Sequence, residues 1–309
     1  MKVDTIVLGA GVVGISVALH LQKAGRATLL VDRRAPGEET SYGNAGLIQR
    51  EGVYPYGFPH DFGALFRYAM NNTIDASYHW SAIPKLAPFL FSYWMHSRAS
   101  QHEAIAHKYA KLIEHCVTEH DALAQEAGAT NLLRRDGWMK VFRTEKERDT
   151  RLAEAARWNR EFGLNYRALD MATLKAEEPH LDHGSLIGGL HWTDPTTVVD
   201  PLGLSKAYVA LFEKLGGKLA IGDAGTLQQN GAGWTVTLAD GTTAEARMSS
   251  SRSAPGRTCS ATSSAIACRW RSSAAITCIT SRRATPCSTT RYSTPSAAIS
   301  SRRCCRASA

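Results

Sequence analysis

Three glycines near the start of the chain have the spacing of a dinucleotide-binding turn. Gly9, Gly11 and Gly14 form the pattern Gly-x-Gly-x-x-Gly, and Asp32 follows 18 residues later. In such a turn the first glycine permits a tight bend and the second lets a pyrophosphate approach the backbone. The third lets the following helix pack close to the sheet, and the acid accepts hydrogen bonds from ribose hydroxyls. The residue types therefore predict dinucleotide binding.

The elements that must position these residues are also readable. Residues 3–8 form an apolar run that is typical of a buried parallel strand, and residues 27–31 form a second run that leads into Asp32. Between them, apolar residues from Val13 to Ala24 recur at helical spacing, and Gly25 is a suitable residue to end the helix. The N-terminus of this helix would offer free N–H groups to phosphate. The sequence thus predicts a βαβ unit of an α/β, Rossmann-like domain.

The nature of the dinucleotide depends on the residues after the second run. Asp32 disfavours a 2′-phosphate through like-charge repulsion, so NADP is not favoured, although Arg33 and Arg34 weaken that argument. Residues 40–47, Thr-Ser-Tyr-Gly-Asn-Ala-Gly-Leu, then offer hydroxyl and backbone N–H groups that could hold a second part of the cofactor. The alternative is a plain surface loop.

The turn at Gly9–Gly14, the acid Asp32 and the loop Thr40–Gly46 resemble those of a flavoprotein family. It comprises D-amino-acid dehydrogenases, glycine oxidase and sarcosine oxidase, and the bacterial D-amino-acid dehydrogenases are the most similar group. In that family the loop lies along the pyrophosphate and the flavin of FAD. The resemblance therefore implies FAD as the cofactor, held by Gly9, Gly11, Val13, Gly14, Asp32, Arg33, Thr40, Ser41, Asn44, Ala45, Gly46 and Leu47.

The resemblance also implies an activity. The expected reaction is oxidation of an amino acid, of D configuration, by hydride transfer to the flavin, and the imine then hydrolyses to a 2-oxo acid and ammonia. The implied partners are the amino acid and an electron acceptor, a quinone or another. A cytoplasmic location is expected. Within it, peripheral association with the inner face of the plasma membrane is one option.

The catalytic residues of this activity are not identified by the sequence. Tyr54 and Tyr56 are candidates to line the substrate side of the flavin, and packing within their own loop is the alternative. In the family, the arginine that binds the substrate carboxylate and an active-site tyrosine come from a segment that here follows residue 247. No pattern of metal ligands is apparent, and no metal is expected.

The remaining elements outline a second, mixed α+β domain that binds the substrate. Strands are expected at 137–143, 186–192 and 197–199 of a mixed sheet, and helices at 101–127 and 145–162. Residues 81–96 carry an apolar face at helical spacing, which we expect in the core, with membrane contact as the alternative. The expected division is a first FAD-binding part at 1–80, a substrate domain at 81–199, a return to the FAD-binding domain at 200–247 and a tail at 248–309.

The tail differs sharply from the rest of the chain. The formal net charge is +8, yet residues 248–309 hold 10 Arg and no Asp, Glu or Lys. The first 247 residues carry 26 basic and 28 acidic groups, so they are close to neutral. The tail also has 16 Ser and 6 of the 7 Cys but no Leu, Val or Phe, so it lacks the apolar residues of a packed domain. We expect it to be disordered.

A frameshift near residue 247 is our interpretation of the tail. The family has a buried strand of the type Val-Val-Val-Ala-Leu-Gly-Pro-Trp at this position. Residues 248–257, back-translated with GC-rich codons and read from the third base, give that peptide. On this interpretation the chain lacks the strand and half of the substrate pocket, and its catalysis is impaired.

Other interpretations of the tail remain open. It could be a basic nucleic-acid-binding segment, but it lacks lysine and regularly placed aromatic residues. Its cysteines do not have the spacing of a tetrahedral zinc site. Two functions remain for the whole chain, a flavoenzyme or a non-catalytic dinucleotide-binding fragment.

Overall fold

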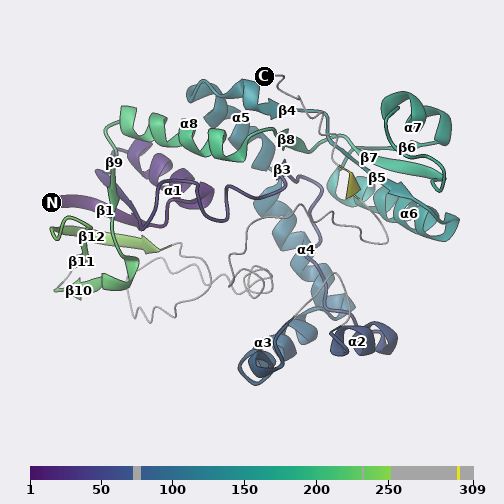
Figure 1. Cartoon of the computed structure of the whole chain (residues 1–309), viewed down its shortest axis with the longest axis horizontal. Coiled ribbons are helices and arrows are strands. Elements are labelled where there is room, and N and C mark those ends of the chain that lie inside the picture. Colours follow the sequence, from purple (N-terminus) through teal and green to yellow (C-terminus); the bar gives the residue numbers. More distant parts are fainter. Residues whose placement is uncertain (72–77, 232, 252–297, 300–309) are drawn as a thin grey trace. The chain divides into compact units, whose positions relative to one another are not determined.

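The structure is a computed structural model that describes residues 1–71, 78–231, 233–251 and 298–299 (Figure 1). The described chain forms two compact units, and it passes between them several times. The first unit comprises residues 1–47, 118–134, 198–231 and 233–251. The second unit comprises residues 48–71, 78–117, 135–197 and 298–299.

The first unit is built on a six-stranded sheet. Its central strands run parallel, and an antiparallel pair extends one edge. The strand order is β10–β11–β12–β1–β2–β9. The bounds are β1 Lys2–Leu8, β2 Thr28–Asp32, β9 Lys218–Ile221, β10 Gln228–Asn230, β11 Gly233–Thr237 and β12 Thr243–Ser251.

Apolar runs make the centre of this sheet a core. Ile6, Leu29 and Val31 are fully buried and cluster with Val236 from the antiparallel edge. Each such side chain contributes about 1.5–3 kcal/mol when it is removed from water. Helices α1 Val12–Lys23 and α8 Pro201–Lys214 pack against each other in the same unit. The unit also contains η2 Thr130–Leu132, η3 Ala224–Thr226 and all but the first two residues of α5 Cys116–Glu126.

The predicted βαβ start is confirmed. The two apolar runs form the parallel pair β1 and β2, and the helix between them is α1. Gly25 follows the end of α1 with φ +75°, the left-handed conformation that glycine adopts without strain. Farther along, the side chain of Asp200 accepts the N–H of Gly203, and Pro201 occupies the first turn of α8.

The expectation that a central strand is missing is wrong. Strand β12 continues to Ser251 and pairs in parallel with β1, with Ile6 opposite Ser249 and Leu8 opposite Ser251. Parallel pairing uses backbone N–H and C=O groups, which serine provides as fully as valine does. The first unit therefore keeps its sheet four residues beyond position 247. The predicted disorder concerns residues that, apart from 248–251 and 298–299, lie outside the described ones.

The second unit contains an antiparallel sheet of order β13–β5–β7–β6. A mixed sheet was expected, but β7 and the strand at 196–198 belong to different sheets. The latter strand, β8, lies between β3 and β4 in a separate three-stranded sheet. Each of these three strands is located where the chain leaves one unit and enters the other. The bounds are β3 Leu47–Ile48, β4 Leu133–Arg134, β5 Trp138–Phe142, β6 Tyr166–Leu169, β7 Gly188–Trp192, β8 Thr196–Val198 and β13 Ala298–Ile299.

Helices complete the second unit. The predicted helix at 145–162 is confirmed as α6, which begins after Thr144, whose side chain accepts the N–H of Glu147, and ends at Gly163 with φ +65°. The single helix expected at 101–127 is wrong. The segment forms two helices, because α4 ends at Ile113 and α5 begins at Cys116, although no glycine or proline lies between them. The other bounds are α2 Phe62–Ala69, η1 Trp80–Ala82, α3 Ile83–His96, α4 Ala99–Ile113 and α7 Met171–Glu177.

Two further differences concern where segments are packed. The expected core position of residues 81–96 is wrong, because α3 has no buried side chain. The unit boundaries also differ from the expected domains, since residues 48–71 and 78–80 belong to the second unit and residues 118–134 to the first. The loop around Tyr54 belongs to the second unit because the Tyr54 ring packs on Trp158 of α6.

Candidate cofactor site

The glycine turn joins β1 to α1 in the first unit. Gly9 has φ +103°, and its N–H donates to the carbonyl of Val31 over 2.8 Å. A Cβ atom at Gly14 would lie 1.8 Å from the carbonyl oxygen of Gly9. No side chain fits there, so glycine at position 14 is what lets the first turn of α1 lie directly against the bend.

The N-terminus of α1 is tied to the loop that follows β2. The hydroxyl of Ser41 accepts the N–H of Val12 over 2.9 Å, and Ser41 is buried. A Cβ at Gly11 would lie 3.2 Å from the same hydroxyl oxygen, so the helix start and the loop are in close contact. An α-helix leaves its first N–H groups without intrahelical partners. Those of Val13 and Gly14 are therefore available to an anion.

The loop at 40–47 is organised by its own polar groups. The side-chain amide of Asn44 donates to the carbonyl of Ser41 over 2.8 Å, and its oxygen accepts the N–H of Gly46 over 2.7 Å. Gly46 has φ +66°, and a Cβ there would lie 2.3 Å from the carbonyl oxygen of Val198. Thr40 and Ala45 remain exposed beside this turn. The structure thus gives the loop a fixed conformation next to the glycine turn.

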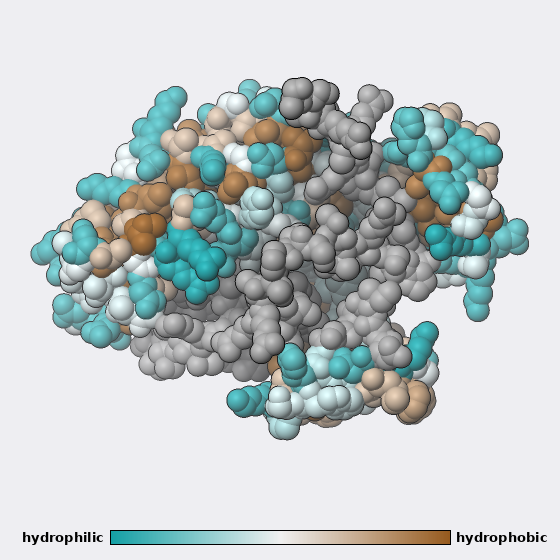
Figure 2. Space-filling model, viewed as in Figure 1, coloured by the Kyte–Doolittle hydropathy of each residue, from teal (hydrophilic) through white to brown (hydrophobic). Residues whose placement is uncertain are grey.

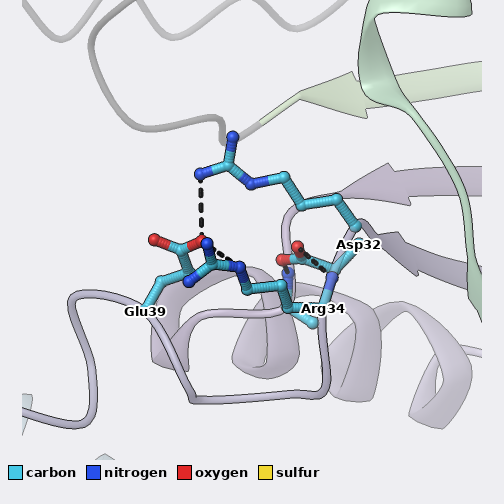
Figure 3. A network of polar contacts seen from close by, with 5 residues as sticks. Asp32, Arg34 and Glu39 are labelled. Carbon is cyan, nitrogen blue, oxygen red and sulfur yellow. Dashed lines mark hydrogen bonds and ion pairs between the residues drawn. The ribbon is translucent and has the colours of Figure 1, made fainter. Parts of the chain in front are cut away.

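Asp32 closes the site at the end of β2 (Figure 3). Its Oδ2 atom accepts the N–H of Ala10 over 2.5 Å, and its Oδ1 atom accepts that of Arg34 over 3.3 Å. The second hydrogen bond is long, so Oδ1 keeps acceptor capacity for a ribose hydroxyl. The carboxylate therefore both fixes the turn and presents an oxygen beside it.

Sequence reasoning missed Glu39. One of its carboxylate oxygens lies 2.9 Å from a guanidinium nitrogen of Arg33 and 3.2 Å from Nε of Arg34 (Figure 3). These exposed ion pairs add little stability. They do pair Glu39 with Arg33 and Arg34, the two cations that could otherwise bind the 2′-phosphate of NADP. The signal in the sequence was an acid in the loop directly after the two arginines.

The residues present fit the dinucleotide part of FAD. Close backbone packing at Gly14 and Gly46 places a helix N-terminus with available N–H groups beside a carboxylate with a free acceptor position. These are the groups that a pyrophosphate and a ribose require. Within the described part of the chain, no three His, Cys, Asp or Glu side chains are placed to hold a metal ion.

The two tyrosine candidates lie in the second unit. The Tyr54 ring stacks on Trp158 with 5.2 Å between ring centroids, and its hydroxyl donates to Glu103 over 2.6 Å. Burial, with the Glu103 hydrogen bond, raises the pKa of Tyr54. Tyr56 is 82% exposed, and its carbonyl accepts the hydroxyl of Tyr93. Tyr54 packs within its own unit, and a substrate-lining role for either residue stays a prediction.

A buried acid, Glu51, was also missed. It is 4% exposed, and its Oε1 atom accepts Nε1–H of Trp138 over 2.6 Å and the amide of Gln49 over 3.1 Å. Its Oε2 atom is buried and has no hydrogen-bond partner among the described residues. Desolvation raises the pKa of Glu51 against the lowering effect of these hydrogen bonds. An acid in a loop rich in glycine and proline gave no sign of burial.

A Glu51→Gln substitution should change how stability depends on pH. The folded-state pKa is raised above the ordinary value of 4.5, so ionisation of Glu51 opposes folding. The unmodified chain should lose stability relative to the variant as pH rises from 4.5 through the folded pKa, by about 1.4 kcal/mol per unit of pKa difference. Urea unfolding at a series of pH values measures this.

Trp138→Phe supplies the matched comparison, because it removes a hydrogen bond that lowers the pKa of Glu51. It should extend the loss of stability to higher pH. Parallel stability profiles of the unmodified chain and Glu51→Gln would show that Glu51 does not titrate in this range.

Comparison of the sequence with known proteins identifies a family. The sequence model of the DAO family, described as FAD dependent oxidoreductase, matches residues 4–250. A D-amino-acid oxidase of Bradyrhizobium diazoefficiens is 30% identical over 181 residues, which are 57% of this chain and 42% of the relative. A D-amino acid dehydrogenase of Vibrio vulnificus is 30% identical over 200 residues, or 62% of this chain and 46% of the relative. The chain thus spans about half the length of these curated relatives.

Solved structures support the fold. Glycine oxidase from Geobacillus kaustophilus superposes with a TM-score of 0.56 at 18% identity, over 82% of this chain and 55% of that one. L-amino acid deaminase from Proteus vulgaris gives a TM-score of 0.54 at 14% identity, over 81% and 47%. Because the family match covers most of the sequence and ends within β12, the chain belongs to the DAO family of FAD-dependent oxidoreductases.

Proposed function

We propose that the protein oxidises the α-carbon of a D-amino acid to an imine, which water converts to a 2-oxo acid and ammonia. The observation that carries the proposal is the α1 N-terminus, packed against the glycine bend at Gly14, with the Asp32 carboxylate beside it. When bound, FAD accepts the hydride that leaves the α-carbon. The D configuration is supported by the names of the curated relatives at about 30% identity.

The described residues would serve to place the cofactor. The N–H groups of Val13 and Gly14 would bind the pyrophosphate, and Asp32 would accept a ribose hydroxyl. Ser41 and Asn44 hold the loop and the helix start in one arrangement, so little entropy is lost on binding. The substrate carboxylate calls for an arginine, which binds it through two hydrogen bonds. We place that arginine in the part of the family fold that follows residue 247.

Electrons would pass from the reduced cofactor to a quinone or another acceptor. We further propose a cytoplasmic protein that associates peripherally with the inner face of the plasma membrane, where such an acceptor is found. In the described part of the chain, no helix has both the length and the apolar character needed to cross a bilayer.

A second candidate concerns the 309-residue chain itself. Its glycine turn, Asp32 and the loop at 40–47 all precede position 247, whereas residues 248–309 contain no Leu, Val or Phe. This combination favours a chain that binds FAD without turnover. The purified chain should therefore bind FAD, seen as flavin absorbance, and show no reduction of an artificial electron-accepting dye on addition of D-amino acids. Dye reduction by this chain would contradict the assignment.

The same assay on a form with a corrected reading frame tests the proposed reaction. A screen of D- and L-amino acids should give dye reduction with D-amino acids that exceeds that with L-amino acids. Preference for an L-amino acid would overturn the stereochemical proposal. Resequencing the locus around codon 247, with mass spectrometry of residues 248–309, tests the frameshift. An intact single frame would show that no frameshift occurred.

A further inference from the structure

Five large apolar side chains are exposed on neighbouring helical segments of the second unit. Phe62, Phe66 and Met70, at α2, are 89%, 67% and 60% exposed, and Trp80 of η1 and Phe91 of α3 are 65% and 64% exposed. We call these five residues the aromatic face. Exposed apolar side chains that lie together in one patch mark an interaction surface, whereas singly scattered ones do not.

The spacing of the α2 residues puts them on one side of that helix. Phe62, Phe66 and Met70 are four residues apart, which aligns them on α2, whereas Ala64 on the opposite side is buried. Trp80 belongs to the 3₁₀ segment η1 that precedes α3, so helical spacing does not relate it to Phe91, but both side chains are exposed. Each segment therefore has large apolar side chains that remain uncovered.

The opposite side of α3 is already occupied. The Tyr93 hydroxyl donates to the carbonyl of Tyr56 over 2.6 Å, and the N–H of Phe58 donates to Ser97 over 2.8 Å. Phe58 also makes an edge contact with the Tyr93 ring at 5.4 Å. Because this side is held by the unit, the exposure of Phe91 is a consequence of how α3 is docked.

The two segments are joined to each other. The Tyr78 hydroxyl donates to the carbonyl of Ala69 at the end of α2 over 2.8 Å, and its ring lies 5.3 Å from that of Trp80. Figure 1 shows α2 and α3 next to each other, and tan to brown side chains lie exposed over α2 in Figure 2. The aromatic face is thus carried by one connected helical element.

The charge of this element is net positive. Residues 61–98 include Arg67, Lys85 and Arg98 against two acids, Asp61 and Asp75, and the side chain of Asp61 caps α2. The first 247 residues as a whole carry a small negative net charge, so the small positive excess here is local. Aromatic and aliphatic side chains bordered by cations are the features of elements that lie in the interface of an anionic bilayer.

We propose that the aromatic face docks on the surface of an anionic membrane. Its Phe, Met and Trp side chains enter the boundary between headgroups and acyl chains, and Arg67, Lys85 and Arg98 contact the lipid phosphates. The proposal rests on the peripheral association put forward above and names the surface responsible. A second copy of the chain is disfavoured as occupant, because an isologous contact would bring the same cations together.

Flotation of the 309-residue chain with lipid vesicles tests the proposal. The chain should float with phosphatidylcholine vesicles that contain phosphatidylglycerol, and less with phosphatidylcholine alone or at high salt. The double substitution Phe62→Ser with Phe66→Ser should lower the partition coefficient at least about tenfold, as should Phe91→Ser combined with Trp80→Ser. Arg67→Glu should weaken binding to the anionic vesicles only.

Leu112→Ser is the matched control, because Leu112 of α4 is 66% exposed and lies outside the aromatic face. All substituted side chains are exposed, and circular dichroism with thermal melting verifies that each variant is folded. Vesicle binding needs no amino-acid turnover, so a chain without dye reduction can still support the proposal.

Three results would overturn it. The first is an unmodified chain that does not float with anionic vesicles. The second is a loss of binding in Leu112→Ser that equals the loss in the double variants. The third is a sedimentation mass that falls in the double variants while flotation is unchanged, which would assign the aromatic face to contact between copies of the chain.

Discussion

A Gly14→Ala substitution is expected to abolish stoichiometric FAD binding. The added Cβ would lie 1.8 Å from the carbonyl oxygen of Gly9, and both groups belong to the backbone, so the start of α1 must move. The move would displace the N–H groups of Val13 and Gly14, which we propose bind the pyrophosphate. Loss of two hydrogen bonds to a charged group corresponds to an affinity decrease of about a hundredfold or more. Flavin absorbance of the purified variant and titration with FAD measure the effect.

A loss of FAD binding in Gly14→Ala would be informative, because helix propensity alone would make alanine at this position stabilising. Alanine within a helix is favoured over glycine by roughly 0.5–1 kcal/mol, so a loss must come from the clash. Gly57→Ala is the matched control, since a Cβ at Gly57 would lie 3.8 Å from its nearest neighbours, two ring atoms of His102, which is ordinary van der Waals contact. A Gly14→Ala chain with full flavin content would refute the assigned role of this glycine.

The parts of the fold that local sequence determines were predictable. Continuous apolar runs form β1 and β2, and the positions of Gly14 and Gly25 agree with the bounds of α1. The limits of α6 were also predictable, because Thr144 and Gly163 provide its caps. In each case the residues that define the element lie within or next to it, so no distant contact is needed to interpret them.

The parts that depend on distant contacts were not predictable. The apolar face of α3 is no different in sequence from a core helix, and only its docking through Tyr93 and Ser97 leaves Phe91 outside. The burial of Glu51 depends on Trp138, 87 residues away. Strand β12 differs for another reason, since its serine-rich sequence is atypical of a buried strand, whereas its backbone pairs in parallel with β1.

The candidate site divides in the same way. The residue types of the glycine turn, Asp32 and the loop could be read from the sequence. The bond from Val12 to Ser41, which fixes the loop on the helix, joins residues 29 apart, and no local pattern indicates it. Pairing of Glu39 with Arg33 and Arg34 was equally hidden, although it bears on the choice between phosphorylated and unphosphorylated ribose.

Substitutions of Asp32 should separate its two contributions, one to folding and one to cofactor affinity. Asp32→Ala leaves the N–H of Ala10 without its acceptor, and Ala10 is 1% exposed. An unpaired buried donor costs about 1–3 kcal/mol, so this variant should be destabilised by that amount. It should also lose the charge-assisted bond that we propose between Asp32 and the ribose, and bind FAD about 10–100-fold more weakly.

Asp32→Asn keeps one oxygen for the N–H of Ala10 and removes the negative charge. We expect it to recover most of the stability that Asp32→Ala loses, while its FAD affinity stays at least about tenfold below that of the unmodified chain. Asp4→Asn is the control, because Asp4 accepts the N–H of Ala27 over 2.9 Å at the opposite end of β1. Equal recovery of stability and affinity in Asp32→Asn would mean that Asp32 serves only to hold the turn, and that the ribose is bound by other groups.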